Sequence, residues 1–334
     1  MRSPLWRCVL LAGVLACALL PGAVRAEGPL RVGFLSGGGG LGDQAYNDMT
    51  YKGLRQAQAE HGLLLTVVDR RDVEDSWAEV LETLADEVDV LALPGTEYAP
   101  VAPELARAHP ELRIILLDSV LDPCPDNVSC VTFRQNEAAF LAGALAGYVT
   151  HTGTVGFIGG TDTRPVRDFL AGYAAGVRHV APQVRVLQAW AAPNENFAGF
   201  RMPHRGLELA LDMYDDGADI VFAAAGRTGN GVIEAARRSG NYAIGVDADQ
   251  DHLARGVVLA SAMKRLDTAL TAQIDAIVAG EFRSGVHVMG LAEGGVGLSP
   301  MQYSRDVVGE AVRLRLAALA RAVADGEITV PSAQ

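Results

Sequence analysis

The chain alternates short apolar runs with stretches of helical periodicity, and this alternation limits its fold more than any other feature. Most runs have four to eight residues, are rich in Val, Ile and Leu, and end in Gly, Asp or Ser, as buried parallel strands do. They lie at 30–36, 63–69, 88–94, 113–119, 128–133, 154–159, 184–190, 218–225 and 242–247. Segments with the 3.6-residue spacing of a helix fill most of the intervals between these runs. Such β-α-β repetition predicts an α/β fold with two doubly wound parallel sheets.

The length of 334 residues exceeds a usual single core, which predicts two lobes with a cleft between them. We expect three crossings between the lobes: near Arg134–His151, near Ala260–Arg265, and in the glycine-rich segment GLAEGGVGLS. The predicted division is an N-terminal lobe of 27–134 plus 265–292 and a C-terminal lobe of 135–264 plus 293–330.

Residues 1–26 have the pattern of a cleavable signal peptide. Arg2 and Arg7 precede an apolar run over Val9–Leu20, and small residues before Glu27 predict cleavage after Ala26. The run is too short to span a bilayer. We therefore expect export to the periplasm as a soluble protein. Lipid anchoring at Cys17 is the alternative, although Leu15 fits a lipobox poorly.

Loss of the leader removes three arginines and no acid, so the formal charge falls from −12 to −15. A chain this acidic repels phosphate backbones and anionic lipid, which argues against nucleic acid as a partner. Cys124 and Cys130 remain, six positions apart, and an oxidising compartment predicts a disulfide between them, with two buried thiols as the alternative. Their spacing is poor for zinc.

The loop Gly37–Gly42 follows the first apolar run and formally matches the dinucleotide-binding fingerprint. Asp69 ends the second run, where such sites place an acid for the ribose. This match leaves a nucleotide-dependent oxidoreductase as an alternative. Nicotinamide cofactors are scarce outside the cytoplasm, however, and the polar segment 43–47 delays the helix that should meet the pyrophosphate.

Two further stretches lie at predicted strand ends. The segment 225–232 is again strand, glycine loop and helix, and it makes Thr228 and Gly229 candidates for ligand contact through free amides. Asp247 ends a buried strand, where its carboxylate could hold sugar hydroxyls. Lys264 follows the next strand and could satisfy one of the acids at 247 and 249.

Catalytic motifs are lacking. The sequence has no G-x-S-x-G, no H-E-x-x-H and no exposed nucleophilic cysteine, and its seven histidines share no spacing. We therefore expect a monomeric binding protein, not an enzyme, without a cofactor or a metal.

Six segments occur in the order seen in the basic membrane protein (BMP) family, the PnrA-like substrate-binding proteins of ABC transporters. They are GDQAYND, NVSCVTFRQNEAAFLAGALAGYVT, TGTVGFIGGTD, GADIVFAAAGRTGNGVIEA, YAIGVDADQ and SAMKRLDTA. The chain resembles this family over about residues 30–300. The resemblance implies the type I periplasmic-binding fold, capture of a purine nucleoside between the lobes, and delivery to an inner-membrane ABC permease. A receptor for another small aromatic or sugar-like solute is the alternative.

The family motif D-x-x-F-N matches Asp43, Tyr46 and Asn47, with tyrosine in place of the stacking phenylalanine. Asp247 matches the acid that binds ribose hydroxyls, and Lys264 matches the lysine of the S-x-x-K stretch. Many members have an aspartate that reaches the purine edge where this chain has Gly37, so the resemblance does not fix the base. Phe169, Phe197 and Phe200 are all candidates for the second stacking aromatic, and Phe169 is our choice.

Overall fold

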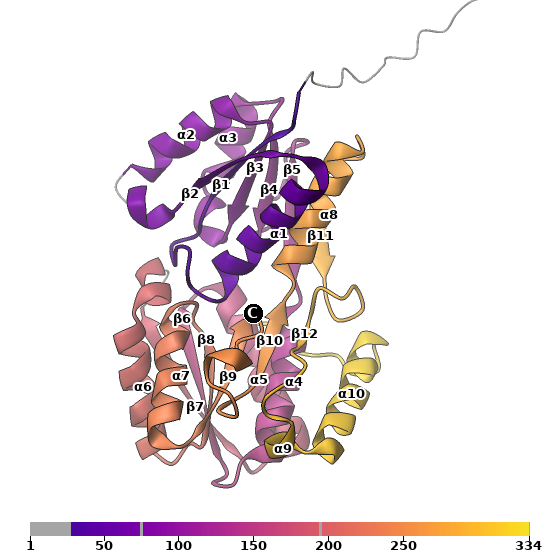
Figure 1. The fold of residues 1–334 in the computed structure, drawn as a ribbon. Coiled ribbons are helices and arrows are strands. Elements are labelled where there is room, and N and C mark those ends of the chain that lie inside the picture. Colours follow the sequence, from indigo (N-terminus) through magenta and orange to yellow (C-terminus); the bar gives the residue numbers. More distant parts are fainter. Residues whose placement is uncertain (1–27, 74–75, 194–195, 334) are drawn as a thin grey trace, which may run out of the picture.

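The computed structural model describes residues 28–73, 76–193 and 196–333. Two lobes lie one above the other, each built on a six-stranded sheet with helices on both faces (Figure 1). The signal peptide and its cleavage site lie outside the described residues. Among the residues described, no helix combines the length and the apolar character needed to cross a membrane.

The first sheet has the strand order β11-β5-β4-β3-β1-β2, and all its neighbours are parallel. Its strands are β1 (Arg31–Leu35), β2 (Leu64–Val68), β3 (Val90–Pro94), β4 (Arg113–Leu117), β5 (Val128–Phe133) and β11 (Gly285–Met289). Its helices are α1 (Tyr46–His61), α2 (Trp77–Glu87), α3 (Ala102–Ala108) and α8 (Leu266–Val278). Strands β1, β3, β4 and β5 are buried over most of their length, which explains why these runs lack alternation.

The second sheet has the order β12-β10-β9-β8-β6-β7. Its strands are β6 (Thr154–Thr161), β7 (Arg185–Ala192), β8 (Ile220–Ala224), β9 (Tyr242–Asp247), β10 (Val258–Lys264) and β12 (Val296–Leu298). The helices of this lobe are α4 (Gln135–Val149), α5 (Arg164–Val180), α6 (Pro203–Asp215), α7 (Thr228–Ser239), α9 (Arg305–Val308) and α10 (Glu310–Ala324). Strand β12 runs antiparallel to β10, so the prediction of purely parallel sheets is wrong at this edge.

The chain passes between the sheets three times, as predicted. It crosses between β5 and α4, between β10 and α8, and between β11 and β12. Each of the nine predicted apolar runs contains a strand. The crossings make the last third of the chain part of both lobes, so neither sheet is continuous in sequence.

Helices α4 and α5 pack with their backbones in close approach. A Cβ placed on Gly143 would collide with the carbonyl of Tyr173, and one on Gly176 would collide with that of Phe140. Glycine at these positions removes the side chain that would otherwise separate the two helices. Gly172 makes the same kind of contact with the Asn136 carbonyl, so the close approach reaches the first turn of α4.

The C-terminal segment lies against the N-terminal ends of α4 and α5. Asn136 donates from Nδ2 to the carbonyls of Val330 and Pro331, at 3.1 and 3.2 Å. Asp168 on α5 accepts from Ser332 Oγ at 2.6 Å and from the Ala333 amide at 2.7 Å. The described chain therefore ends at the junction of the lobes, where Figure 1 marks the C-terminus.

The predicted disulfide is not formed in the structure. Cys124 and Cys130 are free thiols whose Sγ atoms lie 3.5 Å apart, whereas a disulfide bond measures about 2.05 Å. Cys124 Sγ instead lies 3.3 Å from the Val128 carbonyl, within reach of a hydrogen bond. Burial raises the pKa of the Cys130 thiol to about 12, which keeps it protonated.

Candidate ligand-binding site

A cavity lies between the lobes, where the carboxyl ends of both sheets meet. Open α/β sheets hold ligands at this edge because loops and helix starts converge there. The N-terminal lobe contributes Gly37, Gly38, Gly39, Asp43, Tyr46, Asn47, Pro94, Gly95, Thr96, Glu97 and Asp118 to its lining. The C-terminal lobe contributes Thr163, Pro165, Val166, Phe169, Phe197, Phe200, Ala224, Ala225, Gly226, Val246, Asp247 and Lys264.

Asp43 and Asn47 organise the start of α1. One carboxylate oxygen of Asp43 accepts from the amides of Ala45 and Asp48, and the other accepts from the Asn47 amide and from Asn47 Nδ2 at 2.9 Å. Asn47 Oδ1 in turn accepts from the Gly37 amide at 2.7 Å. Both side chains line the cavity, and their hydrogen bonds hold the glycine loop against the first turn of the helix.

Three further amides of the glycine loop are also occupied by side chains. Gly38 donates to Glu97 Oε1 at 2.6 Å, Leu41 to Asp69 at 3.0 Å and Gly42 to Asp48 at 2.7 Å. A pyrophosphate site needs such amides free and a surplus of positive charge. Here carboxylates take three of these amides and bring negative charge to the loop, which argues against the oxidoreductase alternative.

Lys264 and Asp118 join the two lobes through a buried ion pair. Lys264 Nζ, at the end of β10, lies 2.6 Å from Asp118 Oδ2, just past the end of β4, and the two side chains are 2% and 7% exposed. A second bridge runs from Gln250 Nε2 to the Gln44 carbonyl at 3.0 Å. Lys264 therefore pairs across the cleft, not with the acids at 247 and 249 that the sequence suggested. These contacts hold the lobes together in the structure.

Asp247 ends β9 with a left-handed backbone, φ +62°, and its side chain lines the cavity. Asp118 and Gln44 also have positive φ, +58° and +57°. Non-glycine residues in this region are uncommon and cluster at functional sites. Burial raises the pKa of Asp247 from 3.8 to about 7; the charge of Lys264 opposes this rise and those of Asp118 and Asp43 add to it. The structure thus holds a carboxyl group poised to titrate near neutral pH.

Aromatic rings enclose the space around Lys264 and the glycine loop. Lys264 Nζ lies 5.5 Å from the Tyr46 ring and 5.2 Å from the Phe169 ring. Phe197 and Phe200, on the 3₁₀ helix η3 (Phe197–Arg201), lie 6.4 Å apart between ring centres and face the glycine loop. All three phenylalanines that the sequence left open therefore reach the cavity.

The hydroxyl of Tyr46 is buried and has no hydrogen-bond partner among the described residues. Burial raises its pKa, and the charges of Asp118, Glu97 and Asp247 raise it further. The phenol therefore stays protonated, and its hydroxyl is available for a hydrogen bond with a ligand.

Thr228 and Gly229 do not line the cavity. The Thr228 hydroxyl donates to the Gly199 carbonyl at 2.6 Å and accepts from the Met202 amide at 2.8 Å, which ties η3 to the start of α7. The Gly229 amide donates to the Gly226 carbonyl. The second glycine loop instead reaches the cavity through Ala224, Ala225 and Gly226.

Two acids at the cavity escaped the sequence analysis. Asp118 lies near the end of the predicted strand 113–119, as Asp247 lies at the end of 242–247, and that position was the available signal. Glu97 lies on a short 3₁₀ helix, η2 (Thr96–Tyr98), after β3, and no motif marks it.

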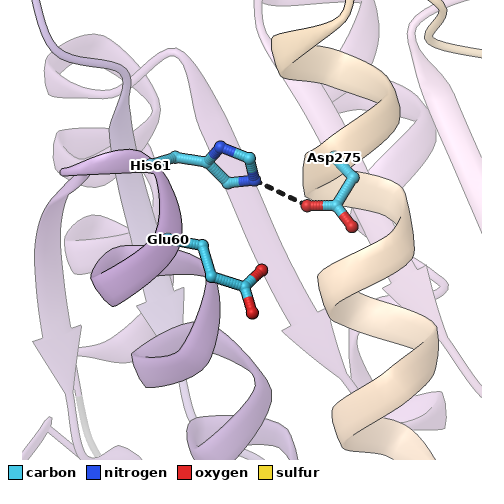
Figure 2. A group of neighbouring side chains, drawn as sticks. All are labelled: Glu60, His61 and Asp275. Atoms are coloured by element: carbon cyan, nitrogen blue, oxygen red, sulfur yellow. Dashed lines mark hydrogen bonds and ion pairs between the residues drawn. The ribbon is translucent and has the colours of Figure 1, made fainter.

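Figure 2 shows a separate cluster on the surface of the N-terminal lobe, formed by Glu60 and His61 at the end of α1 and Asp275 on α8. His61 Nε2 lies 2.6 Å from Asp275 Oδ1. All three residues are exposed. The His61–Asp275 ion pair joins α1 and α8, which explains why these side chains lie close together.

The sequence profile of the PnrA-like ABC transporter substrate-binding proteins matches residues 31–331. Basic membrane protein D of Borreliella burgdorferi is 31% identical over 267 residues, which cover 78% of this chain and 76% of that protein. An uncharacterized lipoprotein of Pyrococcus abyssi is 30% identical over 283 residues, 80% of this chain and 68% of that protein.

A solved ABC transporter solute-binding protein from Aeropyrum pernix K1 has the same fold. Its TM-score is 0.80 at 25% identity, with coverage of 92% of this chain and 94% of that chain. The predicted two-lobed type I periplasmic-binding fold is therefore confirmed. These relatives are solute-binding proteins and not enzymes, as predicted. The chain belongs to the PnrA-like family of ABC transporter substrate-binding proteins.

Proposed function

We propose that the protein captures a purine nucleoside in the interlobe cavity and delivers it to an ABC permease. The observation that carries this proposal is the pairing of a buried carboxyl group, Asp247, with aromatic rings in one enclosed space. A ribose needs an acceptor for its vicinal hydroxyls, and a base needs apolar faces. The cavity offers both kinds of contact.

The proposed sugar end is formed by Asp247 and Lys264. A buried carboxylate is costly unless it is hydrogen-bonded, and vicinal hydroxyls would supply two donors to it. The proposed base end lies among Tyr46, Phe169, Phe197 and Phe200, with the glycine loop as its floor. Asn47 and Asp43 would act mainly by fixing that loop.

Capture would proceed by closure of the lobes. The closed cavity measures about 90 Å³, whereas pockets for drug-sized ligands span about 300–1,000 Å³. The lobes must therefore move apart at the three crossings to admit a nucleoside. Contacts from both lobes to the bound ligand would then favour a closed state whose cavity is larger than that of the ligand-free structure.

We further propose that the chain acts outside the cytoplasm as a monomer, exported by its leader. Members of its family serve ABC transporters, which supports a permease as its partner. One relative is called a lipoprotein, and cleavage after Ala26 or anchoring at Cys17 can be separated by mass spectrometry of protein from the producing cell.

Calorimetry should detect one site that favours purine nucleosides over cytidine and over free sugars. Adenosine, guanosine and inosine form the test panel, and chromatography of the recovered ligand should show no free base. Absence of heat with every nucleoside, or steady release of base, would contradict the proposal. Heat with a free sugar or another aromatic solute alone would favour the second candidate, a receptor for such a ligand.

Replacement of Tyr46 by alanine should weaken nucleoside binding by about 1–3 kcal/mol, the range for stacking of a base on an aromatic ring. Tyr46→Phe keeps the ring and should cost little. The measurement is the Kd of both variants for the tightest nucleoside of the panel. Equal losses in the two variants would assign the contact to the hydroxyl instead of the ring.

A further inference from the structure

Glu97 brings an additional carboxyl group to the base end of the cavity. It lies on η2, which follows β3 through Gly95, a residue with φ +111°. Glu97 Oε1 accepts from the Gly38 amide at 2.6 Å. That hydrogen bond ties the side chain to the glycine loop. The other carboxylate oxygen, Oε2, takes no part in it.

The position of Glu97 is set by the absence of a side chain on Gly37. A Cβ on Gly37 would lie 3.0 Å from the Pro94 carbonyl oxygen, 3.2 Å from Glu97 Oε1 and 3.3 Å from Asn47 Oδ1. All three distances are shorter than ordinary contacts of a Cβ atom. The Glu97 carboxylate therefore occupies space that a side chain at position 37 would otherwise need.

The carboxylate has two backbone donors and still has lone pairs for a further one. Burial raises the pKa of Glu97, while hydrogen bonds from its own backbone amide and from the Gly38 amide, and the charge of Arg70, act in the opposite direction. Phe197 from the opposite lobe closes over the same loop, with its Cβ 3.0 Å from the Cβ position of Gly38. The edge of a flat ring held between the lobes here would point at Glu97.

We propose that Glu97 selects the base by accepting a hydrogen bond from an N–H donor on its edge, which favours purine nucleosides that carry such a donor, such as inosine with its N1 proton. Purine riboside has only an acceptor at N1, which would face the carboxylate. A site that offers this acceptor disfavours ligands without the donor, because they lose the hydrogen bond. This inference rests on the proposed nucleoside function.

The test compares inosine with purine riboside, which lacks the N1 proton and the 6-oxo group. The wild-type protein should bind inosine about 10–100-fold more tightly, the effect of one hydrogen bond to a charged group. Glu97→Gln keeps the Oε1 acceptor for Gly38 and should lower inosine affinity about tenfold or more, with purine riboside changed less than about twofold. Its matched control is Glu104→Gln, on the exposed face of α3, which should alter neither Kd.

Equal losses for both ligands in Glu97→Gln, or no loss for either, would overturn the role of Glu97 as a base reader. If that variant does not fold, Glu97→Asp gives the same comparison, because the shorter carboxylate cannot reach the ring and the preference for inosine should disappear. Wild-type protein that binds no nucleoside would refute the proposed function itself. Wild-type protein that binds adenosine and purine riboside as tightly as inosine would refute only the role of Glu97.

Discussion

Asp247→Ala should weaken ribonucleoside binding by roughly 3 kcal/mol, on the order of a hundredfold in Kd, because it removes the charged acceptor of two hydroxyl groups. Asp247→Asn keeps the shape and should lose much of the same affinity. Wild-type protein should already bind 2′- and 3′-deoxynucleosides weakly, and neither variant should distinguish them from the ribonucleoside. Isothermal titration of the three proteins with the three ligands measures the effect.

The same carboxyl group predicts a pH dependence. Its pKa in the ligand-free fold is about 7, and hydroxyl donors favour the ionised form, so ligand binding should lower that pKa and release a proton below about pH 7. Affinity should then rise from pH 5.5 to pH 7.5. Calorimetry in buffers of different ionisation enthalpy measures the number of protons released on binding. The Asp247→Asn variant should release no proton.

The matched control is Asp249→Asn. Asp249 lies two residues away and accepts from the Asp251 amide at 3.3 Å, but it does not line the cavity. Its replacement should leave ribose discrimination unchanged. If wild-type protein binds ribo and deoxy forms alike, Asp247 does not hold the sugar, and its left-handed backbone has a structural purpose only.

Lys264→Met should lower the free energy of unfolding of the ligand-free protein by about 3–5 kcal/mol, because it leaves Asp118 as a buried charge without its cation. Removal of both charges in Lys264→Met with Asp118→Asn should restore most of that loss, since an uncharged pair carries no such penalty. Urea unfolding of the two single variants and the double variant yields the coupling energy.

Lys52→Met provides the comparison for Lys264. Lys52 pairs with Asp267 at 2.9 Å, but its side chain is 63% exposed, and Asp267 keeps a second cation, Arg265, at 3.0 Å, so the loss of Lys52 should cost less than about 1 kcal/mol. Equal costs for Lys52→Met and Lys264→Met, or additive costs in the double variant, would show that the interlobe pair contributes nothing beyond a surface ion pair.

Local pattern sufficed for nine strands, including the edge strands β2 and β7, and failed for β11 and β12. Strands β1 to β9 were predicted because most of them are apolar runs rich in Val, Ile and Leu. Strand β11 has the half-exposed sequence GVHVM, and β12 has three residues, so neither carries the apolar signal. Their pairing with β5 and β10 is a tertiary contact, which decides strand formation where the intrinsic preference is weak.

The site residues likewise fall into those that the local sequence indicates and those that only the three-dimensional structure shows. Tyr46, Asn47, Asp247 and Lys264 were chosen because they follow strands or loops, and all four reach the cavity. Asp118 also lies at a strand end, but its pairing with Lys264, across 146 residues of sequence, depends on the closure of the lobes and has no local signal. The pattern around Thr228 predicted the turn correctly but could not show which side of it faces the ligand, because that depends on how η3 packs.

The late return of the chain to the first sheet has a consequence for its synthesis. Strand β5 borders β11, and Ser129 pairs with Gly285. At about 5–20 residues per second, a ribosome needs about 10–30 s to make the intervening chain. During that time β5 is an open edge, which can pair with another nascent chain. A fragment that ends near residue 134 keeps this edge permanently, so we expect such fragments to aggregate instead of folding as an isolated lobe.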